Sequence, residues 1–347
     1  MKKTYFRRVT EQTPTRFWIN NPSRAEVDLS ICEGAVGCTC NPSYCGKMLE
    51  RQEEREYVIN NIDEIIKNVD DDTKVHEILQ RKIIKPIADK FMPIFENTNH
   101  KQGYVSIQGD PLNENVENIV QSARENSKVG KNILCKVPAT ADGLKAIEML
   151  LAEGISINVT ECFAIQQIVC VCEIYKKYCF RKSSPPKIFI SHIAGIYEDY
   201  LKEFVEKSGI QIERDILEQS GLAIARKAYK LIKERYPDVG FVGGGARNIH
   251  HFTEMVGGDV NVTINWRKTA DLLLELDPPV IYRIFNPVES YVIEELNEKL
   301  PDFRVGYMED GLEPEGFEDF GPVVKFRSSF INDWKKTLEA IHNRRIG

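Results

Sequence analysis

The sequence contains no apolar segment long enough to cross a bilayer. Its most apolar stretch, Ile165–Ile174, is short and is interrupted by Gln166, Gln167 and Glu173, whereas a membrane span needs about 20 apolar residues. The basic start, MKKTYFRR, is followed by VTEQTPTRFW and not by the apolar core of a secretion signal. We therefore expect no membrane partner and a cytoplasmic location.

The chain also has no surplus of positive charge. Its 46 Lys and Arg residues are outnumbered by 52 Asp and Glu residues, which gives a net charge of −6. A protein that binds nucleic acid needs extra cations for phosphate contacts, so nucleic acid is not an expected partner.

Paired cysteine knuckles of the kind that hold structural zinc are missing as well. The nine cysteines are an odd number, and in a cytosolic chain we expect them to be reduced thiols. Cys32, Cys38, Cys40 and Cys45 lie close together, but zinc sites favour Cys-x₂₋₄-Cys pairs, and Cys38 and Cys40 belong to a predicted strand. We interpret them as packing residues and expect neither a metal nor a cofactor.

Short β-rich runs alternate with helical patterns along the chain. The eight predicted strands are Arg16–Asn20, Ala35–Cys40, Gly103–Gly109, Ile133–Pro138, Ile155–Thr160, Lys187–Ile193, Val239–Gly244 and Val260–Trp266. Between them lie helices such as Asp142–Glu153, with Thr140 at the N-cap position. Strands that alternate with helices form right-handed βαβ units and a parallel sheet. The predicted fold class is therefore α/β, as a (β/α)₈ or TIM barrel.

Two segments extend this minimal barrel. Residues 43–95 form a helical insertion between the second and third strands, and residues 281–347 form a C-terminal tail that ends in an amphipathic helix, Asn332–Ile341. We expect a single domain over residues 1–347, with the barrel core at about residues 15–280 and the tail over its mouth. The oligomeric state stays open, a homo-oligomer included.

Polar side chains follow the carboxyl ends of the predicted strands, where barrels of this kind carry their catalytic groups. This set comprises Asn20, Asn41, Gln108, Lys136, Asn158, Thr160, Ser191 and Arg247. Lys136 stands within an apolar strand and is expected to point into the barrel. Desolvation there disfavours the ammonium form, and a neutral amine can attack a carbonyl. The alternative is a structural lysine satisfied by backbone carbonyls or by one carboxylate.

Several segments, in the correct order, resemble the transaldolase family. CKVPATADGLKAIEML resembles the strand that carries the family's Schiff-base lysine, and GAVGCTCNPS resembles its second strand. VSIQGD, GISINVTECFA and GGGARN correspond to strands three, five and seven, and FEDFGPVVKFRSSFINDW resembles the closing tail of some members. The resemblance covers most of the chain from about residue 15, and five ordered motifs are a specific signal.

The resemblance implies a class I mechanism in carbohydrate metabolism, with the pentose phosphate pathway as its setting. Lys136 would form a Schiff base with a ketose, and the iminium would accept electrons while the C3–C4 bond breaks. The bound dihydroxyacetone unit would then pass to an aldehyde acceptor. By position, Asn41 and Asn158 would bind hydroxyls of that unit. Thr160 and Gln108 would hold the water that shuttles protons.

The sequence departs from the family pattern at three positions. Asn20 replaces the first-strand aspartate that takes the C4 hydroxyl proton, and an amide cannot take a proton. Gln108 replaces a glutamate, as in the fructose-6-phosphate aldolase branch. Ile196 replaces an arginine that binds phosphate in typical members. Arg247 remains, beside the backbone N–H groups of residues 243–245, at the usual barrel phosphate position.

Two carboxylates and a pair of histidines are further candidates for functional residues. Asp110 and Glu161, just past strands three and five, are the nearest groups that could replace the missing aspartate. Ser191 is expected near the bound ketose. His250 and His251 are expected at a solvated helix start rather than as a ligand pair, because adjacent helical residues face different ways.

Two other functions stay open. The first is an aldolase of the same chemistry that releases dihydroxyacetone, which Gln108 favours slightly. The second is a barrel that binds a sugar without turnover, which Asn20 and Ile196 would permit. Retention of Lys136 in an apolar strand argues against the second.

Overall fold

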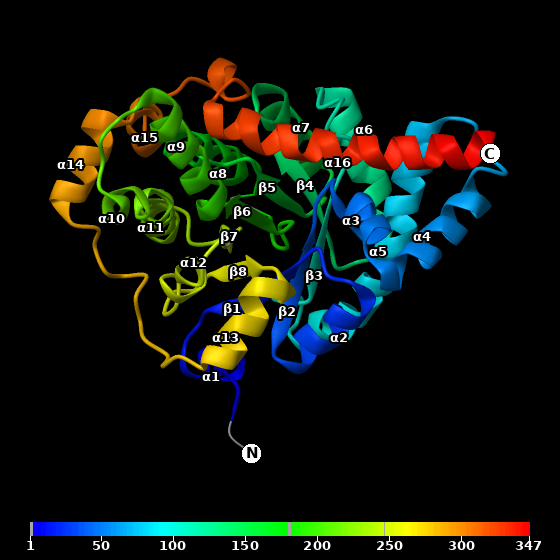
Figure 1. Cartoon of the computed structure of the whole chain (residues 1–347), viewed down its shortest axis with the longest axis horizontal. Helices are drawn as coiled ribbons and strands as arrows, with labels where there is room; N and C mark the ends of the chain where they lie inside the picture. Colours follow the sequence, from blue (N-terminus) through cyan, green and yellow to red (C-terminus); the bar gives the residue numbers. More distant parts are fainter. Residues whose placement is uncertain (1–2, 180–181, 246) are drawn as a thin grey trace.

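A computed structural model describes residues 3–179, 182–245 and 247–347, and its centre is a closed barrel of eight parallel strands in chain order (Figure 1). The strands are β1 (Arg16–Asn20), β2 (Ala35–Cys40), β3 (Tyr104–Gln108), β4 (Ile133–Pro138), β5 (Ile157–Thr160), β6 (Ile188–His192), β7 (Gly240–Gly244) and β8 (Asn261–Ile264). All eight predicted strands are confirmed, with ends that differ by at most two residues. β1 pairs with both β2 and β8, which closes the (β/α)₈ barrel.

Helices surround the strands. They are α1 (Tyr5–Gln12), α2 (Arg24–Cys32), α6 (Val116–Ser127), α7 (Ala141–Ala152), α8 (Ile165–Cys179), α9 (Ala194–Ser208), α10 (Arg214–Leu217), α11 (Ser220–Arg235), α12 (His250–Thr253) and α13 (Asp271–Leu276). The predicted N-cap of α7 is confirmed, because the Thr140 hydroxyl accepts the Gly143 N–H at 3.0 Å. Such a cap satisfies a backbone donor that the first helical turn leaves free.

The barrel interior has an apolar floor and a polar mouth. The floor is one buried cluster that includes Trp18, Tyr104, Leu134, Phe189 and Val242. Residues two positions apart in a strand share a face, so the next inward positions are Asn20 on β1, Lys136 on β4 and Ser191 on β6. Gly37 leaves room for the floor, because a Cβ there would lie 2.3 Å from the Trp18 ring. The alternation therefore places Asn20, Lys136 and Ser191 at the carboxyl ends of their strands.

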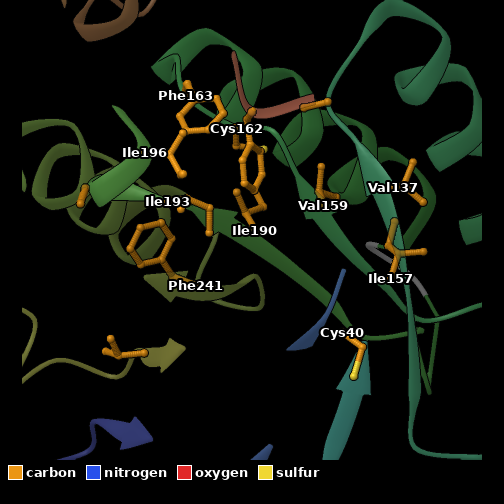
Figure 2. Packing of buried hydrophobic residues seen from close by; sticks show 14 of the residues in the cluster. Cys40, Val137, Ile157, Val159, Cys162, Phe163, Ile190, Ile193, Ile196 and Phe241 are labelled. Carbon is orange, nitrogen blue, oxygen red and sulfur yellow. The ribbon is translucent and has the colours of Figure 1, made fainter. Parts of the chain in front are cut away.

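Outward-facing strand residues pack against the helices. Figure 2 shows Val137, Ile157, Val159, Ile190 and Phe241 within this layer, and each is at most 1% exposed. Because these strands are covered on both faces, they carry continuous apolar runs, and such runs made the strands recognisable in the sequence.

The insertion and the tail both consist of helices. The insertion contains α3 (Tyr44–Glu50), α4 (Gln52–Ile65) and α5 (Asp72–Asn97), and the tail contains α14 (Ser290–Lys299), α15 (Pro301–Tyr307) and α16 (Gly321–Ile346). α16, red in Figure 1, is longer than the predicted Asn332–Ile341 helix and packs against α3, α4, α5 and α9. Within the described residues, no helix is long and apolar enough to cross a membrane.

Candidate active site

Lys136 lies in the mouth of the barrel, as its position in an apolar strand predicted. It is in register with Gln108 on β3 and Asn158 on β5, and only 8% of its surface is exposed. It lines a cavity of about 210 Å³ whose walls come from β1, β2, β6, β8 and α16. The rings of Phe326 and Phe330 on α16 lie 6.0 and 5.6 Å from its Nζ, measured to the ring centroids. The tail therefore covers the lysine.

Burial changes the acidity of this lysine. Desolvation lowers the pKa of Lys136 to about 8, and the nearby Lys47 cation acts in the same direction. The negative charges of Glu161 and Glu114 oppose the shift without cancelling it. In the part of the chain that the structure describes, no hydrogen bond or ion pair holds the ammonium group. A substantial fraction of the amine is neutral near pH 8, and the neutral amine is the nucleophilic form.

Asn158 and Thr160, on β5 beside Lys136, have polar atoms left to bind a ligand. The Asn158 Oδ1 accepts a hydrogen bond from the Ser191 hydroxyl at 2.7 Å. The Asn158 Nδ2 and the Thr160 hydroxyl are buried without a protein partner among the described residues. Buried polar atoms are normally paired, so these two groups are candidates for contacts with a bound hydroxyl or water.

Asn41 is held in one orientation just after β2. Its Oδ1 accepts hydrogen bonds from the Asn21 Nδ2 at 2.9 Å and from the Ser43 N–H at 3.1 Å. Since both contacts use the oxygen, the Nδ2 of Asn41 is the group left to donate. It lines the same cavity as Lys136.

Asn20 lies in the mouth but is fully engaged as an amide. Its Nδ2 donates to the Asn265 Oδ1 at 2.9 Å, and its Oδ1 accepts from the Thr39 hydroxyl at 2.9 Å. The cavity that contains Asn20 also contains Lys136. Position 20 therefore carries an amide, which has no carboxylate to accept a proton.

A cluster of charges lies on the β3–β5 side of Lys136. The Nε of Arg327, on α16, lies 2.9 Å from Glu114, and its Nη2 lies 3.3 Å from Glu161. The Gln108 amide nitrogen donates to Glu114 at 3.4 Å. Neither Glu114 nor Arg327 could be singled out from the sequence, because each lies in a segment with many charges of similar appearance.

The two carboxylates that the sequence offered as substitutes differ in placement. Asp110 accepts hydrogen bonds from the Leu112 N–H and the Asn113 side chain, both at 2.8 Å, and stabilises the loop after β3. Glu161 is fully buried, and its charge acts on the pKa of Lys136 more strongly than that of any other group. Asp110 lines a cavity together with Lys136 and Gln108, whereas Glu161 is buried beside that cavity and acts on Lys136 through its charge.

The same cavity is also lined by two cations and by Ile196, the position that the resemblance assigned to an arginine. Arg247, Ile196 and Lys47 line it together. The Arg247 Nε donates to Asp199 at 2.8 Å. Lys47 belongs to α3, and burial lowers its pKa, with the Arg247 charge acting in the same direction. Lys47 was not predicted as a site residue, since nothing in its local helical pattern distinguishes it from a surface lysine.

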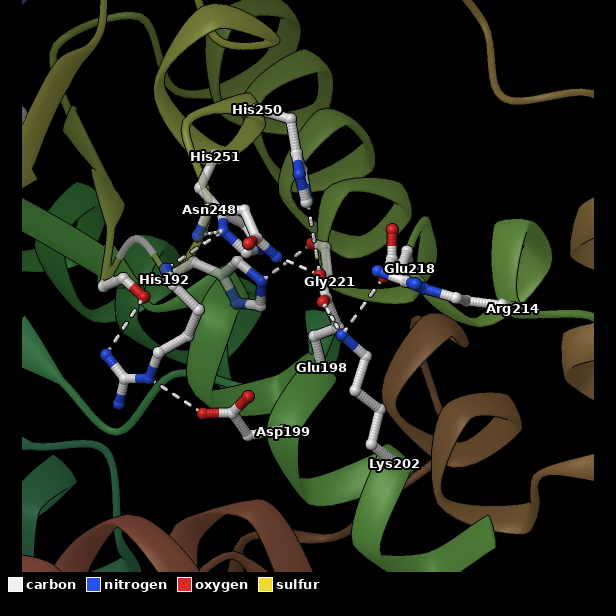
Figure 3. A network of polar contacts seen from close by, with 12 residues as sticks. His192, Glu198, Asp199, Lys202, Arg214, Glu218, Gly221, Asn248, His250 and His251 are labelled. Carbon is white, nitrogen blue, oxygen red and sulfur yellow. Dashed lines mark hydrogen bonds and ion pairs between the residues drawn. The ribbon is translucent and has the colours of Figure 1, made fainter. Parts of the chain in front are cut away.

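The expectation for the histidine pair is wrong for His251. This side chain is fully buried, and its Nε2 lies 2.9 Å from Glu198 (Figure 3). Its Nδ1 accepts the backbone N–H groups of Arg247 and Asn248, at 3.2 and 3.3 Å. Glu198 lies 53 positions earlier on α9, so a local helical pattern could not reveal the pairing.

The same contacts determine whether this cluster can bind a metal. The ligand atoms of Glu198, His250 and His251 all lie within 4.8 Å of one another. However, the His251 Nδ1 accepts N–H groups, so the ring proton is on Nε2 and points at Glu198. A protonated nitrogen cannot be a metal ligand. The cluster is therefore a hydrogen-bonded network that holds the loop carrying Arg247.

The fold and this site together define a (β/α)₈ barrel with a buried lysine and amide side chains at its mouth, an arrangement suited to carbonyl chemistry. A family model described as transaldolase/fructose-6-phosphate aldolase matches residues 17–320. The chain belongs to this family.

Curated relatives carry the name transaldolase at modest identity. A transaldolase of Mycobacterium bovis is 30% identical over 236 residues, which cover 64% of this chain and 62% of that protein. A transaldolase of Trichodesmium erythraeum is 28% identical over 161 residues, 44% of this chain and 42% of that protein. The chain thus spans less than two thirds of the relatives it matches. Among solved structures, the aldose reductase of Schistosoma japonicum aligns with a TM-score of 0.30 and 13% identity, over 81% of this chain and 87% of that one.

Proposed function

We propose that the chain transfers a dihydroxyacetone unit from a ketose to an aldehyde acceptor through a Schiff base on Lys136. The observation that carries this proposal is the buried Lys136, 8% exposed, with a pKa lowered to about 8. It lines a cavity that also contains Asn41 and Ser191. Cytoplasmic sugar metabolism is the setting that fits this chemistry.

In the proposed reaction, the neutral Lys136 amine attacks the ketose carbonyl, and loss of water gives an iminium. The iminium withdraws electrons while the C3–C4 bond breaks, and the first aldehyde leaves. Asn41 and Asn158 hold the hydroxyls of the remaining three-carbon unit through their Nδ2 groups. Attack of this unit on a second aldehyde, followed by hydrolysis, completes the transfer and frees Lys136.

Release of free dihydroxyacetone is a second candidate, favoured by Gln108. The two reactions share every step up to C3–C4 cleavage and differ in whether an aldehyde or a proton adds to the three-carbon unit. Gln108 is 2% exposed and in register with Lys136, so it lies where it can influence the water that would take part in release. Product analysis with and without an aldehyde acceptor separates the two reactions.

The test of the covalent step is reductive trapping. Borohydride added with fructose 6-phosphate or dihydroxyacetone should reduce the iminium and add the corresponding mass to the peptide that contains residue 136. Lys136→Ala should abolish the adduct. Lys145→Ala is a matched control, since Lys145 is an exposed α7 lysine paired with Asp142. An adduct of undiminished yield in Lys136→Ala would refute the mechanism.

A further inference from the structure

Two buried carboxylates share a single cation beside Lys136. The Glu114 side chain is 10% exposed, the Glu161 side chain is fully buried, and Arg327 contacts both, at 2.9 and 3.3 Å. Burial raises the pKa of both carboxyls, and the charge of Glu161 raises that of Glu114 further, while Arg327 opposes the shift at both. Two buried carboxylates that contact the same guanidinium hold one proton between them most readily, because one cation balances only one negative charge.

Glu114, one member of this pair, adjoins space that a ligand can enter. Lys136, Gln108 and Glu114 line a second cavity of about 360 Å³ next to the barrel mouth. The Gln108 Nε2 donates to Glu114 at 3.4 Å, and its Oε1 is buried without a partner among the described residues. The Thr160 hydroxyl is buried and unpaired in the same way. Buried polar atoms without partners indicate where a water or a hydroxyl group binds.

We propose that Glu114 and Glu161, held by Arg327, are the general acid–base pair for the reaction at Lys136. This inference rests on the proposed Schiff-base function. It assigns the proton transfers to two carboxylates. Glu114 lies in the loop between β3 and α6, and Glu161 directly follows β5. Arg327 is a positioning residue, since it acts through the carboxylates.

Each proton in this sequence has a source and a destination. The neutral Lys136 nitrogen attacks the carbonyl carbon, forming the C–N bond and moving the carbonyl electron pair onto oxygen. The ionised carboxylate takes a proton from nitrogen, and the protonated one gives its proton to oxygen, which yields a neutral carbinolamine. The pair then protonates the hydroxyl, the C–O bond breaks, and water leaves as the C=N⁺ bond forms. Hydrolysis of the product iminium reverses these transfers.

The charge of the cluster stays constant through these steps. Before dehydration, the singly protonated pair has a charge of −1 and Arg327 a charge of +1. After dehydration, the pair has a charge of −2, and Arg327 and the iminium together have +2. A buried site tolerates the reaction because no uncompensated charge appears in it.

The pair acts among charged and titratable groups from several elements. These are Lys136 from β4, Asp110 after β3, Arg327 from α16 and Glu318 before α16. Because Glu114, Glu161 and Lys136 must together hold a defined number of protons, the rate of Schiff-base formation should be bell-shaped in pH.

The test measures the rate of borohydride trapping of dihydroxyacetone, which carries no phosphate, as a function of pH. Glu114→Gln and Glu161→Gln should each slow trapping at least about 10²-fold, within the range of a positioned acid or base. Each variant should also abolish either the acidic or the basic decline in the bell-shaped dependence of the trapping rate on pH. The double variant should be no slower than the slower single variant, because the two residues act as a unit. Arg327→Lys should keep more activity than Arg327→Gln.

Glu117→Gln is the matched control, since Glu117 is exposed on α6 and close to Glu114 in the chain. If Glu161→Gln does not fold, the Glu114→Gln variant alone tests the acid–base pair, because the Glu114 side chain lies nearer the surface than that of Glu161. An unchanged rate and pH profile in Glu114→Gln, with normal trapping by the natural chain, would overturn the acid–base pair only. Absence of any adduct on Lys136 in the natural chain would instead overturn the Schiff-base function.

Discussion

The Ser191 hydroxyl donates a 2.7 Å hydrogen bond to the Oδ1 of Asn158, and this contact fixes the orientation of the Asn158 amide. Since Oδ1 is occupied, the buried Nδ2 is the atom presented to a ligand. The two residues belong to neighbouring strands, β6 and β5, so the barrel itself sets their separation.

Loss of this contact should weaken ketose binding. Ser191→Ala frees the Asn158 amide to rotate, and one hydrogen bond is worth about 0.5–1.5 kcal/mol, or roughly two- to tenfold. We expect the KM for the ketose to rise by that factor with little change in protein stability. Ser127→Ala, at an exposed α6 position, is the control. Steady-state kinetics of both variants check the prediction, and equal KM values would contradict it.

Restoring a carboxylate at position 20 should speed C3–C4 cleavage. A positioned general base contributes about 10²–10⁴-fold, so Asn20→Asp should raise single-turnover aldehyde release within that range while changing trapping little. The new carboxylate can still accept from Thr39, but the Asn265 amide must turn over to donate to it, since Asn265 now accepts. Slower release from Asn20→Asp than from the natural chain would show that the proton path lies elsewhere.

Asp110 should not contribute to cleavage. Its carboxylate is occupied by the Leu112 N–H and the Asn113 amide, and its role is to shape the loop. We expect Asp110→Asn to leave single-turnover release within about twofold of the natural chain, whereas Glu161→Gln should slow the formation of the covalent intermediate. If release is lost in Asp110→Asn, that residue is the missing base.

The side chain at position 196 should determine how well the protein binds a ketose whose end group is phosphorylated. Ile196 lines the cavity with Arg247 and Lys47, and an arginine at this point would add a charged contact worth about 1.5–3 kcal/mol. We expect poor use of phosphorylated ketoses and an improvement of roughly ten- to a hundredfold in apparent affinity with Ile196→Arg. An ordinary KM for fructose 6-phosphate in the natural chain, with competition by inorganic phosphate, would contradict this.

The free energy of unfolding should decrease as the pH is lowered, because His76 is buried as a neutral ring. His76 stacks on Trp334 of α16 with ring centroids 3.6 Å apart, and desolvation lowers its pKa to about 3. Its folded pKa lies below the unfolded value near 6.5, so its contribution is complete above pH 6.5 and is lost as pH falls towards the folded pKa.

The matched variant is His76→Phe, which keeps a ring against Trp334 but cannot titrate. Below pH 6.5, its unfolding free energy should fall less steeply than that of the natural chain, by about 1.4 kcal/mol per pH unit, the value for one proton. Some slope should remain, because burial also lowers the pKa of His192 and His251. Denaturant titrations at pH 5, 6 and 7 measure this, and identical slopes would contradict it.

The barrel could be predicted closely because each strand and helix is indicated by a pattern of neighbouring residues in the sequence. Each strand is a short apolar run covered on both faces, and the cap at Thr140 follows from one side chain. Lys136 could be identified because a lysine in an apolar strand is unusual. These features depend on residues within a few positions of one another.

Contacts between distant segments could not be predicted in the same way. Glu114 and Arg327 are more than 200 positions apart, and only the packing of α16 brings them to 2.9 Å. The burial of His251 depends on Glu198, which lies on another helix 53 positions earlier, so the residues next to His251 do not indicate it. Lys47 belongs to α3 of the insertion and lines the cavity at the barrel mouth. The amphipathic pattern of that helix does not indicate where the helix packs on the barrel.

The position of α16 has a consequence for the order in which the protein acquires its function during synthesis. All eight strands have been made once the ribosome reaches Ile264, but α16 begins only at Gly321. Until Phe326 and Phe330 have been made, their rings cannot cover Lys136. In the mechanism that we propose, the Glu114–Glu161 pair also lacks its cation until Arg327 has been made. We therefore expect the reactivity of Lys136 to be complete only after α16 has packed on the barrel.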